Sequence, residues 1–370
     1  MKKFLIAFLI VFPIMYIVSG ISGSCIADDD KLEKAYFKDK EIALFGFIEK
    51  HFLGESGEIL TNLLPSGEGH DTLSESIGLL MDYCVLRDKK DLFDIEFSFL
   101  KKNMLTNNYY VKWKYGNTDA TCNAAIDDLR IIRALMDAHD KWGDKAYLDT
   151  AGFIQEGIYN NQVVNHDLCE LYDWKKNTIE NRIPLCYLDL YTMYRMSGFN
   201  AGWSEVAEKG TDIIEKGSFG SGKPLFKKYF GYSNGAYSVD EEYKQSGGIC
   251  MIYTLYTAIH MAEMNEDTEA FTEWLKGEMD KGTLYAWYNP NTLKPSQKME
   301  STAVYALAAV YSKRTGEKEL FNNLLDKMLQ FMVADKNSDY YGGLGNEEGG
   351  GFYSFDNLTA LWALSLAQEN

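Results

Sequence analysis

The feature of this sequence that most restricts its fold is a run of helix-forming segments with few strand signals between them. Apolar residues recur at the i, i+3, i+4 and i+7 spacing of an amphipathic helix. This spacing predicts twelve helices, near residues 33–53, 71–88, 90–105, 121–141, 143–159, 183–197, 201–217, 244–265, 267–280, 299–315, 317–334 and 355–368. A chain with this pattern belongs to the all-α class.

The connections between these helices alternate between two lengths. Tight turns near residues 89, 142, 199, 266 and 316 are separated by long loops at 54–70, 106–120, 160–182, 218–243, 281–298 and 335–354. Gly143, Gly198 and Gly316 supply the glycine expected just past a helix end. Helical hairpins linked in this way predict a closed (α/α)6 barrel, with all long loops at one end forming a cleft. An α-solenoid, whose repeats should resemble one another, and a pair of helical bundles are the alternatives.

The first 27 residues have the layout of an export signal, because Lys2 and Lys3 precede an apolar stretch over residues 4–21. The segment Ser22-Gly23-Ser24-Cys25 resembles a lipidation site, so Cys25 is a candidate lipoprotein anchor. Cleavage after Ala27 and retention as a membrane anchor are the alternatives. We therefore expect residues 1–27 to be an export signal or a membrane or lipid anchor, and residues 28–370 to be a single domain. The protein is expected on the extracellular face of the cell envelope or secreted.

Charge and cysteine content exclude several kinds of partner. With 37 basic against 54 acidic residues the chain carries a net charge of −17, which disfavours binding to nucleic acid. The five cysteines beyond the leader form no CxxC motif and have no histidine at ligand spacing. We expect buried free thiols, no metal and no cofactor, and a monomeric protein.

Aromatic residues are 14% of the chain and gather in the long loops. Tyrosine and tryptophan offer a flat apolar face together with a polar group, which suits stacking on sugar rings. The alternative is that the rings fill the mouth of the barrel as a secondary core. We predict a carbohydrate cleft whose substrate-binding residues are Tyr110, Trp113, Tyr172, Trp174, Tyr187, Tyr237, Trp287 and Tyr341.

Three acidic residues at the loop ends of predicted helices are candidates for catalysis. A glycosidase needs two carboxyl groups across the scissile bond, one protonated and one ionised. Glu75 opens the second helix in uncharged surroundings, Asp128 lies early in the fourth, and Asp240 ends the tyrosine-rich fourth loop. The alternative for each is an acid that only complements the helix macrodipole.

Around Glu75 the sequence resembles glycoside hydrolase family 8. The segment Ser74-Glu75-Ser76-Ile77-Gly78-Leu79-Leu80-Met81 is similar to the family motif Ser-Glu-Gly-x-Gly-Tyr-Gly-Met, from which it departs at Ser76, Leu79 and Leu80. The resemblance implies an (α/α)6 barrel that hydrolyses β-1,4-linked polysaccharides with inversion. It also implies that Glu75 is the general acid.

Three further segments extend this resemblance. Residues 124–142 are similar to the second family signature, in which Asp128 would hold the distorted sugar at the cleavage point, although Ile126 replaces the first aspartate of the motif. Residues 238–240 resemble the segment that carries the general base in one branch of the family, which implies Asp240 as base and leaves Glu241 and Glu242 as alternatives. Residues 184–189, which include Tyr187, resemble a Pro-Ser-Tyr-Leu-Asp segment.

The sequence thus predicts an inverting endo-glycosidase that acts on a β-linked bacterial exopolysaccharide, similar to hydrolases encoded in exopolysaccharide operons. Because an acidic cleft disfavours uronates, a neutral or partly deacetylated amino-sugar polymer is the expected substrate. One alternative is a catalytically silent polysaccharide-binding envelope protein with the same barrel. A polysaccharide lyase is a third possibility, for which a chain with 5 histidines and this negative charge is poorly suited.

Overall fold

The structure, a computed structural model, describes residues 18–65 and 70–369, with side chains from Lys31 onward except those of Glu242 and Ser246. These residues form thirteen α-helices: α1 (Val18–His51), α2 (Ser74–Leu86), α3 (Lys90–Phe99), α4 (Ala125–Trp142), α5 (Lys145–Gln162), α6 (Leu190–Met196), α7 (Gly202–Glu215), α8 (Glu241–Ser246), α9 (Met251–Glu263), α10 (Glu269–Asp280), α11 (Thr302–Arg314), α12 (Lys318–Leu329) and α13 (Ser354–Leu366).

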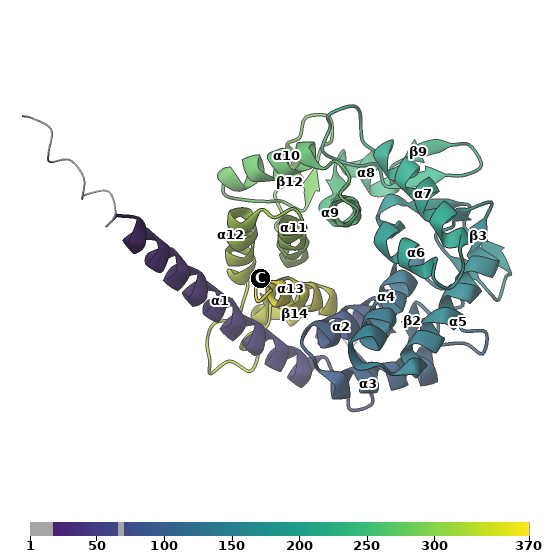
Figure 1. Cartoon of the computed structure of the whole chain (residues 1–370), viewed down its shortest axis with the longest axis horizontal. Coiled ribbons are helices and arrows are strands. Elements are labelled where there is room, and N and C mark those ends of the chain that lie inside the picture. The colour runs from purple at the N-terminus through teal and green to yellow at the C-terminus, as the bar shows by residue number, and fades with distance from the viewer. Residues whose placement is uncertain (1–17, 66–69, 370) are drawn as a thin grey trace, which may run out of the picture.

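Twelve of these helices build the predicted (α/α)6 barrel. Helices α2, α4, α6, α9, α11 and α13 pack side by side in that order, and α13 returns to α2, which closes an inner ring (Figure 1). The other six, α1, α3, α5, α7, α10 and α12, lie outside it. For example, α3 packs on α2, α5 on α4 and α12 on α11. Each helical hairpin therefore contributes one inner and one outer helix.

The burial of each helix follows from its place in the two rings. Inner helix α11 is surrounded by protein, so every residue from 302 to 312 is buried. Outer helix α12 buries only one stripe, Leu320, Phe321, Leu324, Leu325, Met328 and Leu329. A stripe of this kind is the sequence signal of an amphipathic helix, and a continuous apolar run is the signal of a fully buried one.

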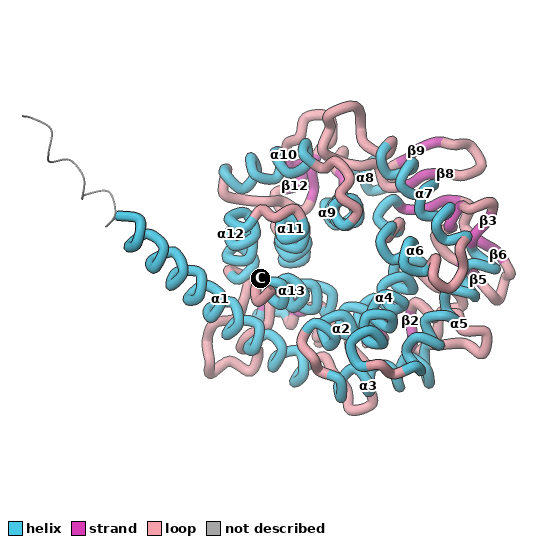
Figure 2. Tube along the Cα trace, viewed as in Figure 1, coloured by secondary structure: helices cyan, strands magenta, loops and turns pink. Residues whose placement is uncertain are grey.

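The long loops hold short strands that sequence analysis does not detect. They are β1 (Thr72–Leu73), β2 (Lys114–Tyr115), β3 (Val163–Val164), β4 (Asp167–Leu168), β5 (Tyr172–Asp173), β6 (Thr178–Ile179), β7 (Arg182–Pro184), β8 (Tyr229–Gly231), β9 (Ala236–Ser238), β10 (Ile249–Cys250), β11 (Trp287–Tyr288), β12 (Pro295–Gln297), β13 (Gly345–Asn346) and β14 (Gly351–Phe352). They pair antiparallel in small sheets around the ring (Figure 2). Strands of two or three residues are too short to show a period-two pattern.

The structure departs from the predicted elements in several places. Helix α1 begins at Val18, so the end of the expected leader continues into the first barrel helix, which projects from the ring (Figure 1). Helix α8 is an additional short helix within the fourth loop. A π-helix (Leu100–Met104) ends α3, and a 3-10 helix (Leu185–Tyr187) precedes α6.

Two of the three glycines expected at helix ends have the backbone that favours glycine. Gly143 has a φ of 74° and Gly316 a φ of 76°. Gly198 also lies just past the end of its helix, after Met196 and the C-cap residue Ser197, but its φ is not positive. Cys84, Cys122, Cys169 and Cys186 are free thiols, and all of them except Cys122 are buried.

Most of the predicted leader, residues 1–17, lies outside the described residues, as does the side chain of Cys25. Within the described part of the chain, no helix combines the length and the apolar character needed to cross a membrane.

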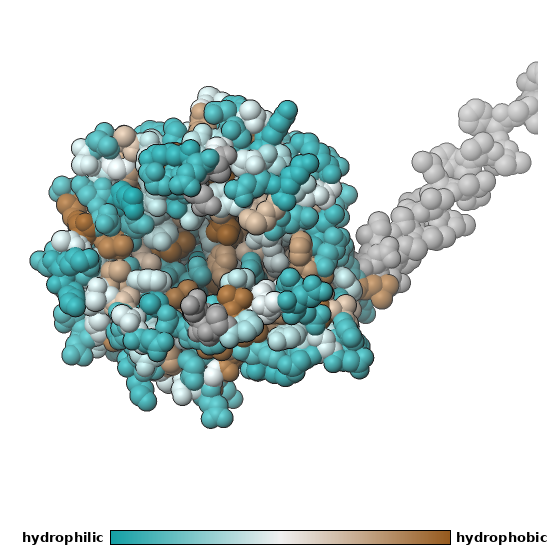
Figure 3. All heavy atoms as spheres, turned by 180° about the vertical axis from the view of Figure 1, so that it is seen from behind, coloured by the Kyte–Doolittle hydropathy of each residue, from teal (hydrophilic) through white to brown (hydrophobic). Residues whose placement is uncertain are grey.

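The order of long and short connections fixes which helix ends form the cleft. Each inner helix follows a long loop, and the five from α2 to α11 precede a tight turn. The amino-terminal ends of all six inner helices therefore lie at the end of the barrel that carries the long loops. Seen from the face opposite that of Figure 1, the ring is hollowed at its centre, with hydrophobic residues in the hollow (Figure 3).

Candidate active site

A cavity of about 400 Å³ lies among the amino-terminal ends of the inner helices. Helix α2 contributes Glu75, α4 contributes Asp127, and α9 contributes Tyr253 and Tyr256. The remaining lining residues are Leu73, Trp113, Cys122, Asn123, Ala124, Ile126, Leu171, Cys186, Tyr187, Ile252 and Phe355. Of the described residues that line this cavity, two are acidic, and we refer to the cavity as the cleft.

Glu75 lies in the first turn of α2 and is half-buried. Burial raises the pKa of Glu75 to about 8, with a further rise from the negative charge of Asp127 that Arg130 opposes. A carboxyl group with this pKa is protonated at neutral pH. Glu75 can therefore donate a proton to a bound substrate.

Asp127 is the second carboxyl group of the cleft and is 6% exposed. One of its oxygens accepts a hydrogen bond from Ser74 Oγ at 2.7 Å, and the other accepts one from Arg130 Nη1 at 3.1 Å. Burial raises the pKa of Asp127, while Arg130 and the Ser74 hydroxyl oppose that rise. The two cleft carboxyl groups thus have different environments. Asp127 accepts two hydrogen bonds, whereas Glu75 accepts none from the described residues.

The structure does not bring Asp128 to the cleft. Its side chain is 1% exposed, and its carboxylate accepts a hydrogen bond from Asn123 Nδ2 inside the protein. Successive residues of an α-helix point about 100° apart, so only one of the two adjacent aspartates can face the cavity. That residue is Asp127, a position the family signature gives to a small residue. The sequence signal was the aspartate pair, and choosing between its members requires the orientation of α4.

Asp240 does not line the cleft. Its carboxylate accepts a hydrogen bond from the Tyr243 backbone N–H at 2.8 Å, which caps α8, and pairs with Lys228 Nζ at 3.2 Å. Lys228 Nζ is 3.8 Å from the centroid of the Tyr253 ring, and Tyr253 lines the cleft. Of the alternatives, Glu241 has a side chain that is 79% exposed and pairs with Lys244, and the side chain of Glu242 lies outside the described residues.

Five of the eight predicted aromatic residues lie at or beside the cleft. Trp113 and Tyr187 line it. Tyr110, Tyr172 and Trp174 form a ring cluster, in which the centroid of Tyr110 is 5.1 Å from that of Tyr172 and 5.7 Å from that of Trp174. The Tyr172 backbone N–H donates to Asn123 Oδ1 at 2.7 Å, and Asn123 lines the cleft. The ring cluster therefore adjoins the cleft wall.

The other three predicted rings are placed differently. Tyr237 packs on Phe230 with the two ring centroids 4.9 Å apart, and the Tyr237 hydroxyl donates to the Ile213 carbonyl oxygen at 2.7 Å. Trp287 lies in β11 and is only 8% exposed. These are the contacts of a secondary core at the barrel mouth, and Tyr341 is likewise absent from the lining of the cleft.

Sequence analysis misses three residues that shape this site. Tyr253 and Tyr256 lie in the first half of α9, and in the sequence their spacing is that of residues on the buried face of a helix. Asp356, in the first turn of α13, accepts a hydrogen bond from the Ala303 backbone N–H at 3.1 Å, and its charge adds to the raised pKa of Glu75. The position of Asp356 at a helix start was the available signal.

Comparison with known proteins places this arrangement in a family. A protein from Clostridium perfringens described as a novel alpha-amylase is 34% identical and has a TM-score of 0.82, covering 88% of this chain and 97% of that chain. PssZ from Listeria monocytogenes is 23% identical with a TM-score of 0.70, over 86% and 93% of the two chains. YdaJ of Bacillus subtilis (strain 168), whose name marks it as a proposed lipoprotein, is 27% identical over 362 residues, 96% of each chain.

The helical barrel and the match to a glycosyl hydrolase family model identify the class of protein as a glycoside hydrolase. The model of glycosyl hydrolases family 8 matches residues 47–224, which include Glu75, Asp127 and Asp128. The chain belongs to glycosyl hydrolase family 8. Solved endo-β-1,4-glucanases, among them CMCax of Acetobacter xylinum at 18% identity and a TM-score of 0.63, share the fold.

Proposed function

We propose that this protein is an inverting endo-glycosidase that cleaves a β-linked glycan, with Glu75 as the general acid. The observation that carries the proposal is a carboxyl group at the floor of the cleft whose pKa is raised to about 8. A protonated carboxyl group within reach of a glycosidic oxygen is the requirement for leaving-group departure. The proposed substrate is a bacterial exopolysaccharide.

In this mechanism Asp127 takes the role that the family signature assigns to Asp128, which is to hold the sugar at the cleavage point. Its carboxylate is fixed by Ser74 and Arg130 and lies beside Glu75. Asp240 remains the proposed base, since Lys228 and Tyr253 connect it to the cleft wall. Inversion requires a base about 6.5–9.5 Å from the acid, so the Asp240 carboxylate would have to turn from Lys228 towards the bound water.

The aromatic residues beside the cleft provide the proposed sugar contacts. Trp113 is 38% exposed and lines the cavity, so one face of the indole is available for stacking. The ring cluster of Tyr110, Tyr172 and Trp174 extends the apolar surface from the Asn123 wall. A surface that runs from Trp113 in the cavity to this ring cluster supports binding of several consecutive sugars, as an endo-acting enzyme requires.

The α-linked glucans are a second candidate substrate class. The observation that favours them is the 34% identity to the Clostridium perfringens protein described as an alpha-amylase. The endo-β-1,4-glucanases are more distant and support the fold alone. Proton donation by Glu75 serves either linkage, so the linkage is decided by how the cleft orients the chain.

The decisive experiment measures new reducing ends from β-1,4-glucans, α-1,4-glucans and exopolysaccharide, with wild-type protein and Glu75→Gln. The variant should lose about 10²–10⁴-fold in rate, because general acid catalysis contributes this much. Glu96→Gln is the matched control, since Glu96 is a fully buried carboxyl residue on outer helix α3. NMR of the first-formed product anomer tests inversion.

Unchanged turnover in Glu75→Gln would contradict the assignment of the acid. Saccharide binding with no reducing ends from any polymer would instead support the silent binding protein.

We further propose that residues 28–370 act as one catalytic unit. Residues 1–27 either hold this unit at the cell envelope or direct its secretion. The relation to YdaJ supports an envelope location.

A further inference from the structure

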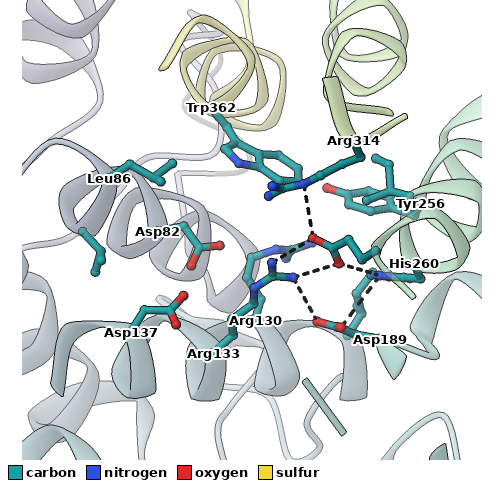
Figure 4. A pocket seen from close by; sticks show the side chains of 14 residues that line it. Asp82, Leu86, Arg130, Arg133, Asp137, Asp189, Tyr256, His260, Arg314 and Trp362 are labelled. Atoms are coloured by element: carbon teal, nitrogen blue, oxygen red, sulfur yellow. Dashed lines mark hydrogen bonds and ion pairs between the residues drawn. The ribbon is translucent and has the colours of Figure 1, made fainter. Parts of the chain in front are cut away.

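A second cavity, of about 130 Å³, lies beyond the floor of the cleft (Figure 4). Its lining comes from the later turns of the inner helices, including Asp82 of α2, Arg133 of α4, Arg314 of α11 and Trp362 of α13. Ile126 and Tyr256 line both cavities, so the two are stacked along the barrel. The catalytic proposal uses none of the charged groups of this second cavity except Arg130.

Three side chains on the wall of this cavity converge on one point. Asp189 precedes α6, and His260 and Glu263 lie three residues apart on one face of α9. One donor atom from each lies within 4.8 Å of the other two. His260 Nδ1 is 3.9 Å from Asp189 Oδ1 and 4.0 Å from Glu263 Oε2, which is too long for a hydrogen bond.

The tautomer of His260 leaves Nδ1 directed at these carboxylates. His260 Nε2 lies 3.2 Å from the Cys186 carbonyl oxygen, which only accepts, so the hydrogen is on Nε2. The His260 side chain is 8% exposed, and Nδ1 has no hydrogen-bond partner among the described residues. A buried lone pair that faces two carboxylates is repelled by them. A metal ion placed between the three groups would remove this repulsion.

The groups around the three donors resemble the outer shell of a metal site. Arg133 donates two hydrogen bonds to Glu263, at 2.8 and 3.0 Å, and Arg314 Nε lies 3.4 Å from the same carboxylate. Thr192 donates to both oxygens of Asp189, at 3.0 and 2.6 Å. Metal-ligating carboxylates are held by outer hydrogen bonds, and ligating histidines donate their other N–H to a carbonyl or carboxylate. The two oxygens that face His260 Nδ1, Asp189 Oδ1 and Glu263 Oε2, each accept one hydrogen bond and keep a lone pair for an ion.

The arginines near this point share the cavity with two further acidic residues. The carboxyl groups of Asp82 and Asp137 lie on the side of Arg133 away from His260 (Figure 4). Arg133 therefore faces acidic groups on both sides. This arrangement reduces the repulsion that a divalent cation beside Glu263 would otherwise meet.

We propose that Asp189, His260 and Glu263 bind a divalent transition metal ion, with zinc as the best match to one imidazole and two carboxylates. Zinc bonds of about 2.0–2.2 Å in a tetrahedral site place ligand atoms about 3.4 Å apart. The two separations from His260 Nδ1, now 3.9 and 4.0 Å, would therefore shorten by about half an ångström on binding. Water in the adjoining cavity completes the coordination. The ion joins α9 to the start of α6 and stabilises the ring, at a distance from the catalytic acid. Sequence analysis predicted no metal because it searched for cysteine motifs.

The experiment uses the full chain without a histidine tag, treated with EDTA and dialysed. Zn²⁺ titrated by calorimetry should bind with one equivalent and raise the melting temperature. Co²⁺ should give the visible absorption of a low-symmetry site with nitrogen and oxygen ligands. His260→Gln should weaken Zn²⁺ binding at least about 100-fold, because it removes a direct ligand. His166→Gln is the matched control, since His166 is an exposed histidine paired with Glu205 at 3.0 Å.

The wild-type protein alone can overturn the proposal. Absence of stoichiometric Zn²⁺ binding and of a Co²⁺ spectrum would show that Asp189, His260 and Glu263 do not bind a metal ion. Equal Zn²⁺ affinity in His260→Gln and wild type would place any bound ion elsewhere. If His260→Gln does not fold, the Co²⁺ spectrum of the wild type decides. Hydrolytic activity is not a readout, so failure here leaves the glycosidase proposal unaffected.

Discussion

The two ends of the barrel use the same helices for opposite purposes. At the amino-terminal ends of the inner helices, Glu75 faces an open cleft of about 400 Å³ with no hydrogen bond from the described residues. In the later turns of the same helices, the Glu263 carboxylate is held by Arg133 and Arg314. Burial raises the pKa of Glu75. The negative charge of Glu263 is instead paired with two arginines.

This difference indicates where the barrel can hold a polar or charged side chain that has no partner within the protein. Long loops allow a substrate to enter and complete the contacts of Glu75, whereas tight turns at the other end leave little room for a large ligand. A buried charge there must be paired within the protein or by an ion. Substitutions at the cleft should therefore alter activity, and substitutions in the second cavity should alter stability.

The largest effect should follow from Arg133→Leu, which removes the two hydrogen bonds to Glu263. Loss of one partner of a buried ion pair costs about 3–5 kcal/mol. The loss here is expected near the lower end of this range, because Arg314 Nε remains 3.4 Å from the Glu263 carboxylate. Urea unfolding in EDTA measures this change without a metal contribution. Lys145→Ala is the control, since its pair with Asp149 is exposed and contributes about 0–1 kcal/mol. A loss of kcat with unchanged stability would contradict the division between the two ends.

The next effect is expected for Asp127→Asn at the cleft. Removing this charge lowers the pKa of Glu75, so the alkaline limb of the activity profile should move to lower pH. The rate at the optimum should fall about 100-fold if the carboxylate holds the reacting sugar. Asp128→Asn, in which the substituted group is buried against Asn123, should leave the alkaline limb in place. The reverse pattern would return the role to Asp128.

Much of the architecture could be predicted from the sequence because the helical periodicity and the alternation of loop lengths both point to one arrangement. Eleven consecutive buried residues in α11 and a single apolar stripe in α12 show why inner and outer helices differ in pattern. The short strands and helix α8 could not be predicted, since segments of two to six residues depend on contacts with other loops.

The site was predictable only where a residue is identified by its local motif. Glu75 follows a recognisable motif at the start of a helix, and the structure places it in the cleft. The choice between Asp127 and Asp128 depends on the rotation of α4, and Asp240 lies in a loop whose course no local pattern specifies. The second cavity combines residues from α2, α4, α9, α11 and α13 with Asp189, which lie far apart in the sequence.

A smaller effect is expected among the aromatic residues. Trp113→Ala removes a ring that lines the cleft and should raise KM about 10-fold, because one stacking contact contributes about 1–1.5 kcal/mol. Tyr237→Phe should leave KM unchanged. It should reduce the free energy of unfolding by about 1 kcal/mol through the lost hydrogen bond to Ile213. Equal KM changes in both variants would show that the cleft extends over the β7–β8–β9 sheet.

Asp82→Asn in the second cavity tests how stability depends on pH. Burial raises the pKa of Asp82 to about 7, with Arg133 opposing the rise, against about 3.9 in an unfolded chain. The folded protein therefore binds an extra proton between these values, and this contribution to stability is present below pH 4 and lost as the pH rises through 7. The amide does not titrate, so from pH 5 to pH 8 the wild type should lose a few degrees of melting temperature relative to Asp82→Asn. A difference between the two proteins that does not vary with pH would show that Arg133 already keeps Asp82 ionised.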